Sequence, residues 1–367
     1  MSGPEVSGDG PAQPDRRLRR AAGILTFATG GLVALALGGA ALLLAPYWSR
    51  VRYIAPDAAA GFRAGYYLYL PAAPRRDGAG RATLLVQPNN SGTTTDDDAV
   101  QRRDAWWTGF ERKRIADRLG TPLLVPAFPR PARAWQVYTH ALDRDTLTTR
   151  DPVLARPDLQ LIAMIDDARA RLGAEGLPVA PRVLVQGFSA SGMFANRFTA
   201  LHPDRVRAAA VGSPGGWPIA PVAIARGQAL PYPAGIADLR ALTGRPFDAA
   251  TFDRVPQLIY MGGKDDNDSL DQRDGWDAAA AADVNRLFGA TPLARWPRAL
   301  ALYRRAGSHA RFELVPGVGH DRKALQEHAT AFFEQVLATG RAADARPAPP
   351  AAAAKHVSRP PAGSRSG

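Results

Sequence analysis

The chain has 367 residues, of which 46% are hydrophobic, so it can bury one large core and is long enough for two domains. It contains no cysteine, which excludes disulfides, thiolate metal sites and a cysteine nucleophile. The net charge of +12 lies mainly at the ends: residues 1–52 carry six arginines against three acidic residues, and residues 340–367 carry five basic residues against one. The body is mildly basic without aromatic residues interleaved among its cations, so nucleic-acid binding is not predicted.

The first element in chain order is an uncharged apolar segment. It runs from Ala21 to Ala45, longer than the ~20 residues that cross a bilayer. A short basic segment, residues 1–20, precedes it with four arginines between positions 16 and 20, and only two arginines follow it closely. We predict a transmembrane signal-anchor helix over residues 21–46, in contact with membrane lipid. The positive-inside rule places its N-terminus in the cytoplasm and the body of the chain outside.

The alternative interpretation of this segment is a cleaved signal peptide, which would give a secreted protein. Signal-peptide apolar regions usually span about 7 to 15 residues, and this segment is much longer. A cut after Ala45 would also place Pro46 at the first mature position. The sequence therefore favours the uncleaved anchor.

Residues 53–339 alternate short apolar runs with longer helical patterns, which is typical of a mostly parallel sheet with helices on both faces. The predicted strands are rich in Val, Leu and Ile, as expected of strands buried on both faces. They are Tyr66 to Leu70, Ala82 to Gln87, Pro122 to Pro126, Arg182 to Gln186, Val206 to Gly212, Pro256 to Met261 and Arg311 to Val315. The predicted helices are Asp158 to Leu172, Ser191 to Leu201, one or two within Val284 to Arg305, and Lys323 to Leu337. The fold class is therefore α/β.

Two stretches fit neither pattern. Residues 213–254 contain six prolines, among them Pro218, Pro221, Pro231 and Pro233, and we predict a small cap-like insertion there. Residues 340–367 are rich in Pro and Ala, without an apolar period, and are predicted to form a disordered tail.

The strongest motif is RVLVQGFSASGMFANRF, in which a short apolar strand runs directly into a helix through Gly187, Phe188, Ser189, Ala190 and Ser191. A serine on such a sharp turn needs small residues two positions before and after it, and here they are Gly187 and Ser191. The turn would leave the amide of Ala190 free to bind an oxyanion at the start of the helix.

This strand, turn and helix resemble the nucleophile elbow of the α/β-hydrolase superfamily, G-x-S-x-G, in its serine esterase and polyester-depolymerase-like branch. The sequence departs from that pattern at Ser191, which raises the question of which serine is the nucleophile. Centring the motif on Ser191 would put Met193 at a crowded position of the turn, so Ser189 is the predicted nucleophile.

The resemblance implies an acid after a later strand and a histidine after the last strand, in that chain order. The strand PQLIYMG is followed by Gly263, Lys264 and Asp265, and the strand ARFELVP by Gly317 and His320. Asp265 is chosen because it lies three residues after Gly262, while Asp266 and Asp268 remain alternatives. The other histidines are predicted to be structural or peripheral, at positions 140, 202, 309, 328 and 356.

Further site residues are predicted around this triad. The second oxyanion amide is expected in the loop after an early strand, at Asn89 or Asn90, with an Asx turn as the alternative. Trp217, at a strand end, is a candidate for the substrate cleft.

The resemblance implies a serine hydrolase of carboxylic esters with a small-molecule or polymeric ester as substrate, and it requires no cofactor and no metal. The alternatives are a serine peptidase or acyltransferase on the same triad, and a non-catalytic envelope binding module.

Overall fold

The computed structural model describes residues 45–90, 92–272 and 274–344. Residues 1–44, which hold the basic segment and nearly all of the predicted transmembrane helix, lie outside this range, as do residues 345–367 of the predicted tail. The chain divides into two compact units, residues 1–52 and 53–367. Of the first unit, residues 45–48 are helical, and strand β1 (Val51–Ile54) begins at its end. Among the described residues, no helix is both long and apolar enough to cross a membrane.

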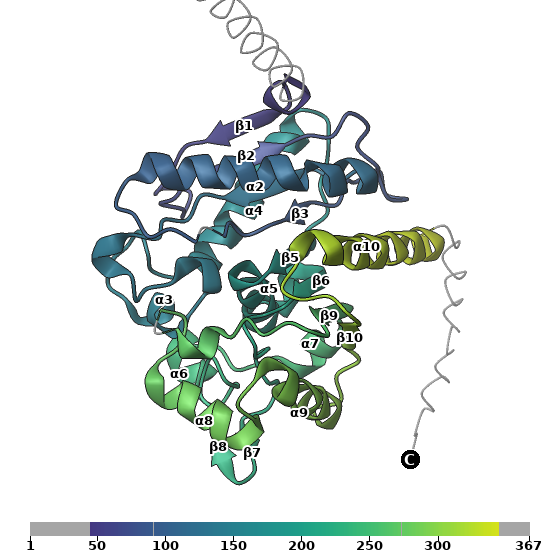
Figure 1. Ribbon diagram of the computed structural model, residues 1–367. Helices are drawn as coiled ribbons and strands as arrows, with labels where there is room; N and C mark the ends of the chain where they lie inside the picture. The colour runs from purple at the N-terminus through teal and green to yellow at the C-terminus, as the bar shows by residue number, and fades with distance from the viewer. Residues whose placement is uncertain (1–44, 91, 273, 345–367) are drawn as a thin grey trace, which may run out of the picture. The chain divides into compact units, whose positions relative to one another are not determined.

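The described residues form one eight-stranded sheet in the order β1-β2-β4-β3-β5-β6-β9-β10 (Figure 1). Strands β3 to β10 of this sheet run parallel to one another, and β2 is antiparallel to β4. The predicted mostly parallel sheet is therefore confirmed. The bounds of the remaining strands are β2 Tyr66–Tyr69, β3 Leu85–Val86, β4 Leu123–Pro126, β5 Val183–Phe188, β6 Val206–Gly212, β9 Gln257–Gly262 and β10 Arg311–Val315.

All seven predicted strands are present, and the differences have local causes. Strand β3 is two residues long, because Ala82 forms an isolated bridge with Val179 instead of extending the ladder. Strand β1 was not predicted: it is short, and its side chains are partly exposed at one edge of the sheet.

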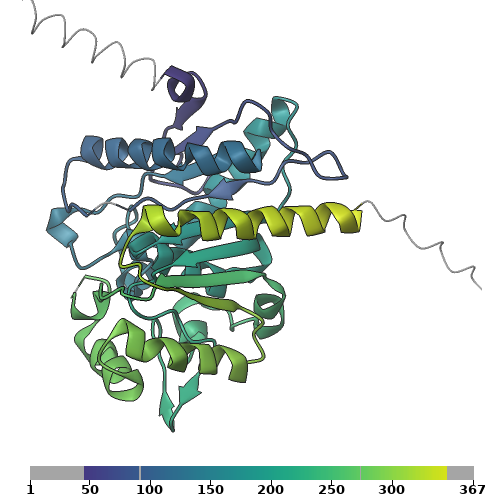
Figure 2. The same ribbon diagram turned by 45° about the vertical axis from the view of Figure 1, so that its right-hand side comes forward.

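Helices cover both faces of the sheet (Figures 1 and 2). Helices α2 and α10 contact each other and pack on one face, and α4 and α5 pack on the other. The bounds are α2 Asp98–Leu119, α3 Arg144–Thr148, α4 Pro157–Ala174, α5 Ala190–Leu201, α6 Leu239–Thr243, α7 Ala249–Arg254, α8 Ala278–Phe288, α9 Pro292–Arg305 and α10 Arg322–Asp344. The sequence did not predict α2, because its buried face includes the polar Gln101 and Arg112 and so lacks a clear apolar period.

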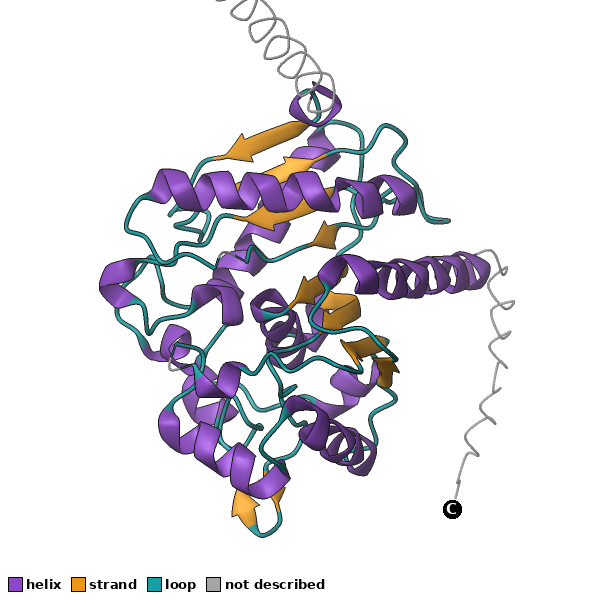
Figure 3. Ribbon diagram, in the orientation of Figure 1, coloured by secondary structure: helices purple, strands orange, loops and turns teal. Residues whose placement is uncertain are grey.

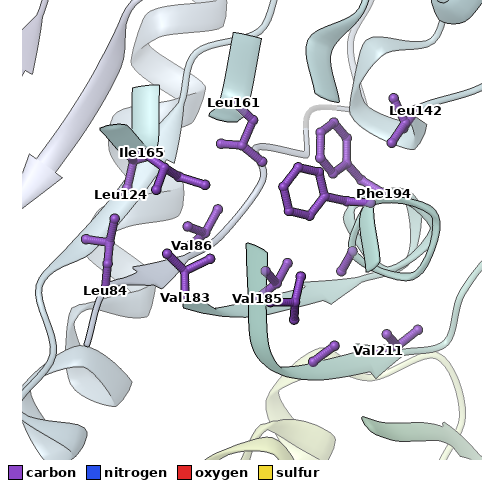
Figure 4. Close-up of a cluster of buried hydrophobic side chains, with 14 of the residues drawn as sticks. Leu84, Val86, Leu124, Leu142, Leu161, Ile165, Val183, Val185, Phe194 and Val211 are labelled. Atoms are coloured by element: carbon purple, nitrogen blue, oxygen red, sulfur yellow. The ribbon is translucent and has the colours of Figure 1, made fainter. Parts of the chain in front are cut away.

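The main core lies between the sheet and helices α4 and α5 (Figure 4). Val183 and Val185 are two residues apart on β5, so both side chains point to the same face of the sheet. There they contact this core, which includes Leu161, Ile165 and Phe194. All five side chains are fully buried, and each such burial stabilises the fold by about 1.5 to 3 kcal/mol. This packing fixes the start of α5 relative to the end of β5, which is the turn that carries Ser189.

Residues 213–254 form an excursion between β6 and β9. It contains the short strands β7 (Ile224–Ala225) and β8 (Gln228–Ala229) and helices α6 and α7, drawn in Figure 3 mostly as loops. Part of it joins α8 and α9 in a second apolar cluster. The predicted helical stretch up to Arg305 divides at Gly289, whose φ of 119° ends α8 before Pro292 starts α9. Helix α10 continues to Asp344, past the predicted domain end at residue 339.

Candidate active site

Ser189 lies on a strained turn between β5 and α5. Its φ of 60° and ψ of −126° are rarely adopted by a residue other than glycine, and such strain costs about 1 to 3 kcal/mol. Its amide donates to the carbonyl of Gly212 at the end of β6, and its carbonyl accepts from the amide of Met193. The side chain is only partly buried. The predicted strand, turn and helix around Ser189 are therefore confirmed as a local structure.

Gly187 and Ser191 make this turn possible. A Cβ added at Gly187 would overlap the backbone carbonyl of Ser191, so position 187 requires glycine. The Ser191 hydroxyl lies 3.0 Å from the Phe188 amide and 2.9 Å from the Phe188 carbonyl, accepting from the first and donating to the second. Ser191 is buried and bound into the turn, which separates its role from that of Ser189.

The loops after β9 and β10 are tied together by their backbones. The amide of Gly263 donates to Val315, and the amide of Lys264 donates to Val318, each at 2.8 Å. Gly262 allows this contact, because a Cβ there would overlap the Val318 carbonyl. Since β9 and β10 are parallel neighbours, both loops leave at the carboxyl edge of the sheet, and their side chains converge there.

His320 and Asp265 meet where these loops converge. The Nδ1 atom of His320 lies 3.0 Å from Oδ1 and 2.9 Å from Oδ2 of Asp265. The Asp265 side chain is 1% exposed, and the amide of Asn267 donates to its Oδ1 at 3.0 Å. Burial alone would raise the pKa of Asp265, but the hydrogen bond and charge of His320, together with the Ser213 hydroxyl and the Asn267 amide, outweigh it and hold the pKa below its usual value. Asp265 is thus a buried carboxylate that can hold Nδ1 protonated.

The two alternative acids lie elsewhere. Asp266 is exposed. Asp268 forms an ion pair with the buried Arg295, whose Nη1 lies 3.1 Å from Oδ1, and it also accepts from the amide of Leu270. Of the three acids, the structure brings Asp265 to His320.

Two residues near His320 were missed by the sequence analysis. The ring of Phe188, next to Ser189 in the chain, packs on the imidazole with centroids 4.7 Å apart, which places His320 beside the turn. The Nδ2 atom of Asn267 lies 3.1 Å from Nε2 of His320. Among the described residues, Ser189 and His320 are not hydrogen-bonded to each other, so Asn267 holds the nitrogen that would face the serine. Its place two residues after Asp265 was the available signal.

The predicted oxyanion donors flank this turn. Ala190 starts α5, and the first amides of a helix have no partner within it. The side chain of Asn89 is buried, with Nδ2 3.0 Å from the Phe128 carbonyl and 2.9 Å from Nε2 of His140. Nδ2 is thereby engaged by the Phe128 carbonyl, which leaves the backbone amide as the other donor of Asn89. The Nδ2 atom of Asn90 donates to the Phe188 carbonyl at 3.2 Å and links this loop to the turn.

A buried polar network connects helix α2 to the turn that carries Ser189. The Nε atom of Arg112 on α2 donates to Oε1 of Gln87 at 3.1 Å, and Nε2 of Gln87 donates to the Pro88 carbonyl at 2.9 Å. The same Nε2 lies 3.4 Å from Oγ of Ser191. Because Gln87 precedes the Asn89 loop, the network joins both predicted oxyanion segments. Residues so far apart in the sequence gave no signal for it.

The predicted cleft position of Trp217 is wrong. The side chain is 1% exposed and packs on Phe288 with ring centroids 4.4 Å apart. Its indole nitrogen donates to the Ala234 carbonyl at 2.9 Å. Trp217 is a core residue of the second apolar cluster, because the glycines before it turn the chain inward after β6.

Four of the other histidines have structural partners. His140 is buried and hydrogen-bonded to the Phe128 carbonyl, and His202 pairs with the buried Asp158 at 2.8 Å. The two remaining pairs are His309 with Asp253 and His328 with Glu313. His356 lies outside the described residues. Within the described part of the chain, no group of three or more His, Asp or Glu side chains could hold a metal ion.

Comparison with known proteins identifies the architecture. No protein-family model matches the sequence, and no curated protein matches it. Among solved structures, it is similar to poly(aspartic acid) hydrolase-1 from Sphingomonas sp. KT-1, with 18% identity and a TM-score of 0.52, over 77% of this chain and 97% of that one. The chain has the α/β-hydrolase fold. A poly(3-hydroxybutyrate) depolymerase from Bordetella parapertussis is also similar, with 18% identity and a TM-score of 0.48, over 81% of this chain and 96% of that one. Because an α/β-hydrolase fold hosts many activities, function has to be argued from the site.

Proposed function

We propose that the chain is a serine hydrolase of carboxylic esters, with Ser189 as nucleophile, His320 as general base and Asp265 as the acid that orients the imidazole. The observation that carries the proposal is the hydrogen bond between His320 Nδ1 and the buried Asp265, beside a serine held at a positive φ. A buried carboxylate on Nδ1 leaves the lone pair of Nε2 available to accept a proton.

The first half of the reaction forms an acyl-enzyme. Ser189 Oγ attacks the ester carbonyl carbon while its proton passes to Nε2 of His320, and the carbonyl oxygen becomes an oxyanion. The amides of Ala190 and of Asn89 or Asn90 are proposed to bind that oxyanion, which would stabilise it by several kcal/mol. The tetrahedral intermediate then collapses, and the leaving alcohol takes the proton from His320.

In the second half of the reaction, a water molecule is the nucleophile and Ser189 is the leaving group. His320 accepts a proton from a water molecule, whose oxygen attacks the acyl carbon, and Ser189 leaves with the proton from the imidazole. The contact between Asn267 and Nε2 has to open in both halves, because the lone pair it faces is the one that takes the proton. Every step uses side chains and amides of this chain and water.

Hydrolysis of an amide bond, or acyl transfer to another acceptor, is the second candidate on the same residues. The similar Sphingomonas protein is named a poly(aspartic acid) hydrolase, which favours including amide polymers among the substrates tested. A non-catalytic binding module is the third candidate function, and the hydrogen bond between His320 and Asp265 argues against it.

The test is a substrate panel on the full chain: p-nitrophenyl acetate and butyrate, the matching p-nitroanilides, poly(aspartic acid) and poly(3-hydroxybutyrate). We expect ester turnover that Ser189→Ala abolishes, and Ser191→Ala serves as the matched control at the neighbouring serine. Anilide or poly(aspartic acid) turnover without ester turnover would favour the amide hydrolase. No turnover of any substrate by a folded protein would favour the binding module.

We further propose that residues 21–46 anchor this domain to a membrane, with the hydrolase domain on the extracytoplasmic side. The support is the uncharged segment and the arginines that precede it. Carbonate extraction of membranes tests the proposal: an anchored chain stays in the pellet, and release of the full-length chain would contradict it.

A further inference from the structure

Gln87 is a buried polar residue that joins strand β3 to the loop that carries Asn89. It is 1% exposed, and its backbone amide continues the sheet by donating to the Leu124 carbonyl of β4 at 3.0 Å. The backbone of Gln87 is therefore fixed by the sheet. A buried carboxamide is costly unless its oxygen and its nitrogen are both hydrogen-bonded, so the partners of these two atoms define the role of the side chain.

Arg112 of helix α2 determines how the Gln87 carboxamide is oriented. Its Nε atom donates to Oε1 of Gln87 at 3.1 Å, and a guanidinium group can only donate. Burial, together with the positive charge of Arg322, lowers the pKa of Arg112 to about 10, so the group is still protonated at neutral pH. The oxygen of the carboxamide therefore has to face Arg112, and Nε2 is the atom left for the other partner.

The Nε2 atom of Gln87 holds the peptide bond between Pro88 and Asn89. It donates to the Pro88 carbonyl at 2.9 Å. This peptide bond is trans, and the C=O and N–H groups of a planar trans peptide point in opposite directions. Fixing the Pro88 carbonyl therefore also fixes the direction of the Asn89 amide, which points away from the Gln87 side chain.

The Asn89 amide has the properties of an oxyanion donor. Among the described residues, it donates to no backbone carbonyl, although Asn89 is 1% exposed. Buried amides without an acceptor are uncommon in proteins, and an amide kept for an oxyanion is one reason for such a group. Asn90 ties the same loop to the turn, because its Nδ2 atom donates to the Phe188 carbonyl at 3.2 Å, directly before Ser189.

We propose that Gln87 is a positioning residue of the oxyanion hole. It directs the Asn89 amide, in preference to that of Asn90, toward the oxyanion, and Arg112 fixes the orientation of its carboxamide. This inference rests on the proposed hydrolase activity and adds to it the second oxyanion amide and the residues that orient it. A donor held in place before the reaction needs no reorganisation when charge develops on the oxyanion, which is how such donors accelerate acyl transfer.

The test is Gln87→Glu in the full chain, with p-nitrophenyl butyrate as substrate. Glutamate keeps the size of the side chain and an acceptor for Arg112, but its second oxygen cannot donate to the Pro88 carbonyl and repels it. We expect kcat to fall by about 10²-fold, as for the loss of one oxyanion donor. KM should change by less than about two-fold, because the interaction is made in the transition state.

Gln257→Glu is the matched control. Gln257 is also buried, at the start of β9, and its Nε2 atom also donates to a backbone carbonyl, that of Phe252 at 3.4 Å. It lies at the opposite end of β9 from Asp265, so its kcat should equal that of the unchanged protein. Thermal unfolding curves of each variant establish that it is folded. A loss of kcat as large in Gln257→Glu as in Gln87→Glu would overturn the proposal, as would a rise in KM with kcat unchanged.

The role of Arg112 is tested by a conservative replacement. Arg112→Lys keeps a cationic donor for Oε1 of Gln87, whereas Arg112→Met leaves the carboxamide free to turn over. We expect Arg112→Lys to retain a higher kcat than Arg112→Met, with similar KM values. Equal kcat values in these two variants would contradict the orienting role of Arg112.

A crystal structure of Gln87→Glu separates this inference from the proposed function. We expect the peptide bond between Pro88 and Asn89 to be rotated, with the contact between His320 and Asp265 unchanged. If the unchanged protein hydrolyses no ester, the proposed function fails, and the direction of the Asn89 amide in the variant still shows whether Gln87 holds it. A peptide bond in the same orientation as in the unchanged protein would overturn the inference.

Discussion

His320 Nδ1 lies within 3.0 Å of both carboxylate oxygens of Asp265, whose side chain is almost completely buried. The two residues come from loops after neighbouring parallel strands, and backbone hydrogen bonds between those loops hold them together. This arrangement fixes the imidazole with its other nitrogen, Nε2, directed away from the carboxylate. The proposed chemistry depends on that orientation.

Replacing the acid tests this dependence. We expect Asp265→Asn to lower kcat for ester hydrolysis by about 10³- to 10⁴-fold, because an amide can hold the wrong tautomer of the imidazole. The measurement is steady-state kinetics on the best ester of the panel. Asp266→Asn, at the exposed neighbouring position, is the control and should keep its activity. A large loss in Asp266→Asn with none in Asp265→Asn would contradict the assignment.

Removing the Asn267 side chain should speed the first chemical step. The side-chain Nδ2 of Asn267 lies 3.1 Å from Nε2 of His320 and occupies the lone pair that has to accept the serine proton. Breaking such a hydrogen bond costs about 1 kcal/mol. Asn267→Ala keeps the backbone amide that donates to Asp265. We expect a rise of about three- to five-fold in the second-order rate constant for inactivation by a fluorophosphonate. A fall in that rate constant would show instead that Asn267 is needed to position the imidazole.

The turn at Ser189 should tolerate no side chain at Gly187. Gly187→Ala would push a methyl group into the Ser191 carbonyl, and we expect the free energy of unfolding to fall by more than 2 kcal/mol. Gly173→Ala is the control, since a Cβ there meets nothing and alanine favours the helix by up to about 1 kcal/mol. Urea unfolding, monitored by circular dichroism, gives the free energy of unfolding of each variant and of the unchanged protein. Equal stability of Gly187→Ala and the unchanged protein would refute the close packing of this turn.

Asp143 should make the stability of the domain depend on pH. Burial raises its pKa to about 7, although the amides of Tyr138 and Thr146 and the nearby Arg197 act in the opposite direction. The unfolded value is about 3.9, so the folded state binds more protons between pH 4 and pH 7. The contribution of Asp143 to the free energy of unfolding is therefore fully present below pH 4. It is lost as the pH rises to 7, by up to about 1.4 kcal/mol per pH unit.

Asp143→Asn removes this titration. Urea unfolding at pH 5 and pH 7.5 is measured for the unchanged protein and for Asp143→Asn. The free energy of unfolding at pH 5 minus that at pH 7.5 should be smaller in the variant by at least 1 kcal/mol. Asp145→Asn, at a neighbouring but only partly buried position, should change it less. An unchanged difference in Asp143→Asn would show that the buried carboxyl does not titrate in this range.

Much of this site could be predicted from local sequence, because its parts are encoded within short segments. The strand, the turn with Gly187 and the helix form one continuous pattern around Ser189. The spacing from Gly262 to Asp265, and the glycines before His320, mark strand-end loops in the same way. These features depend on neighbours along the chain, which a single sequence displays.

The parts that were missed depend on contacts between distant segments. Arg112 supports the turn through Gln87, but it lies on a helix whose buried face contains polar residues, so its period is weak. Trp217 was placed in a cleft because of its position after a strand, whereas its burial against Phe288 is a property of the folded excursion.

The central claim is that Ser189 is an activated nucleophile. The most direct measurement is to react the full chain with a fluorophosphonate and to map the modified residue by peptide mass spectrometry, with Ser189→Ala and Ser191→Ala in parallel. The account predicts one label, on Ser189, that is lost in Ser189→Ala and retained in Ser191→Ala. A label on Ser191, or no label on a folded protein, would contradict it.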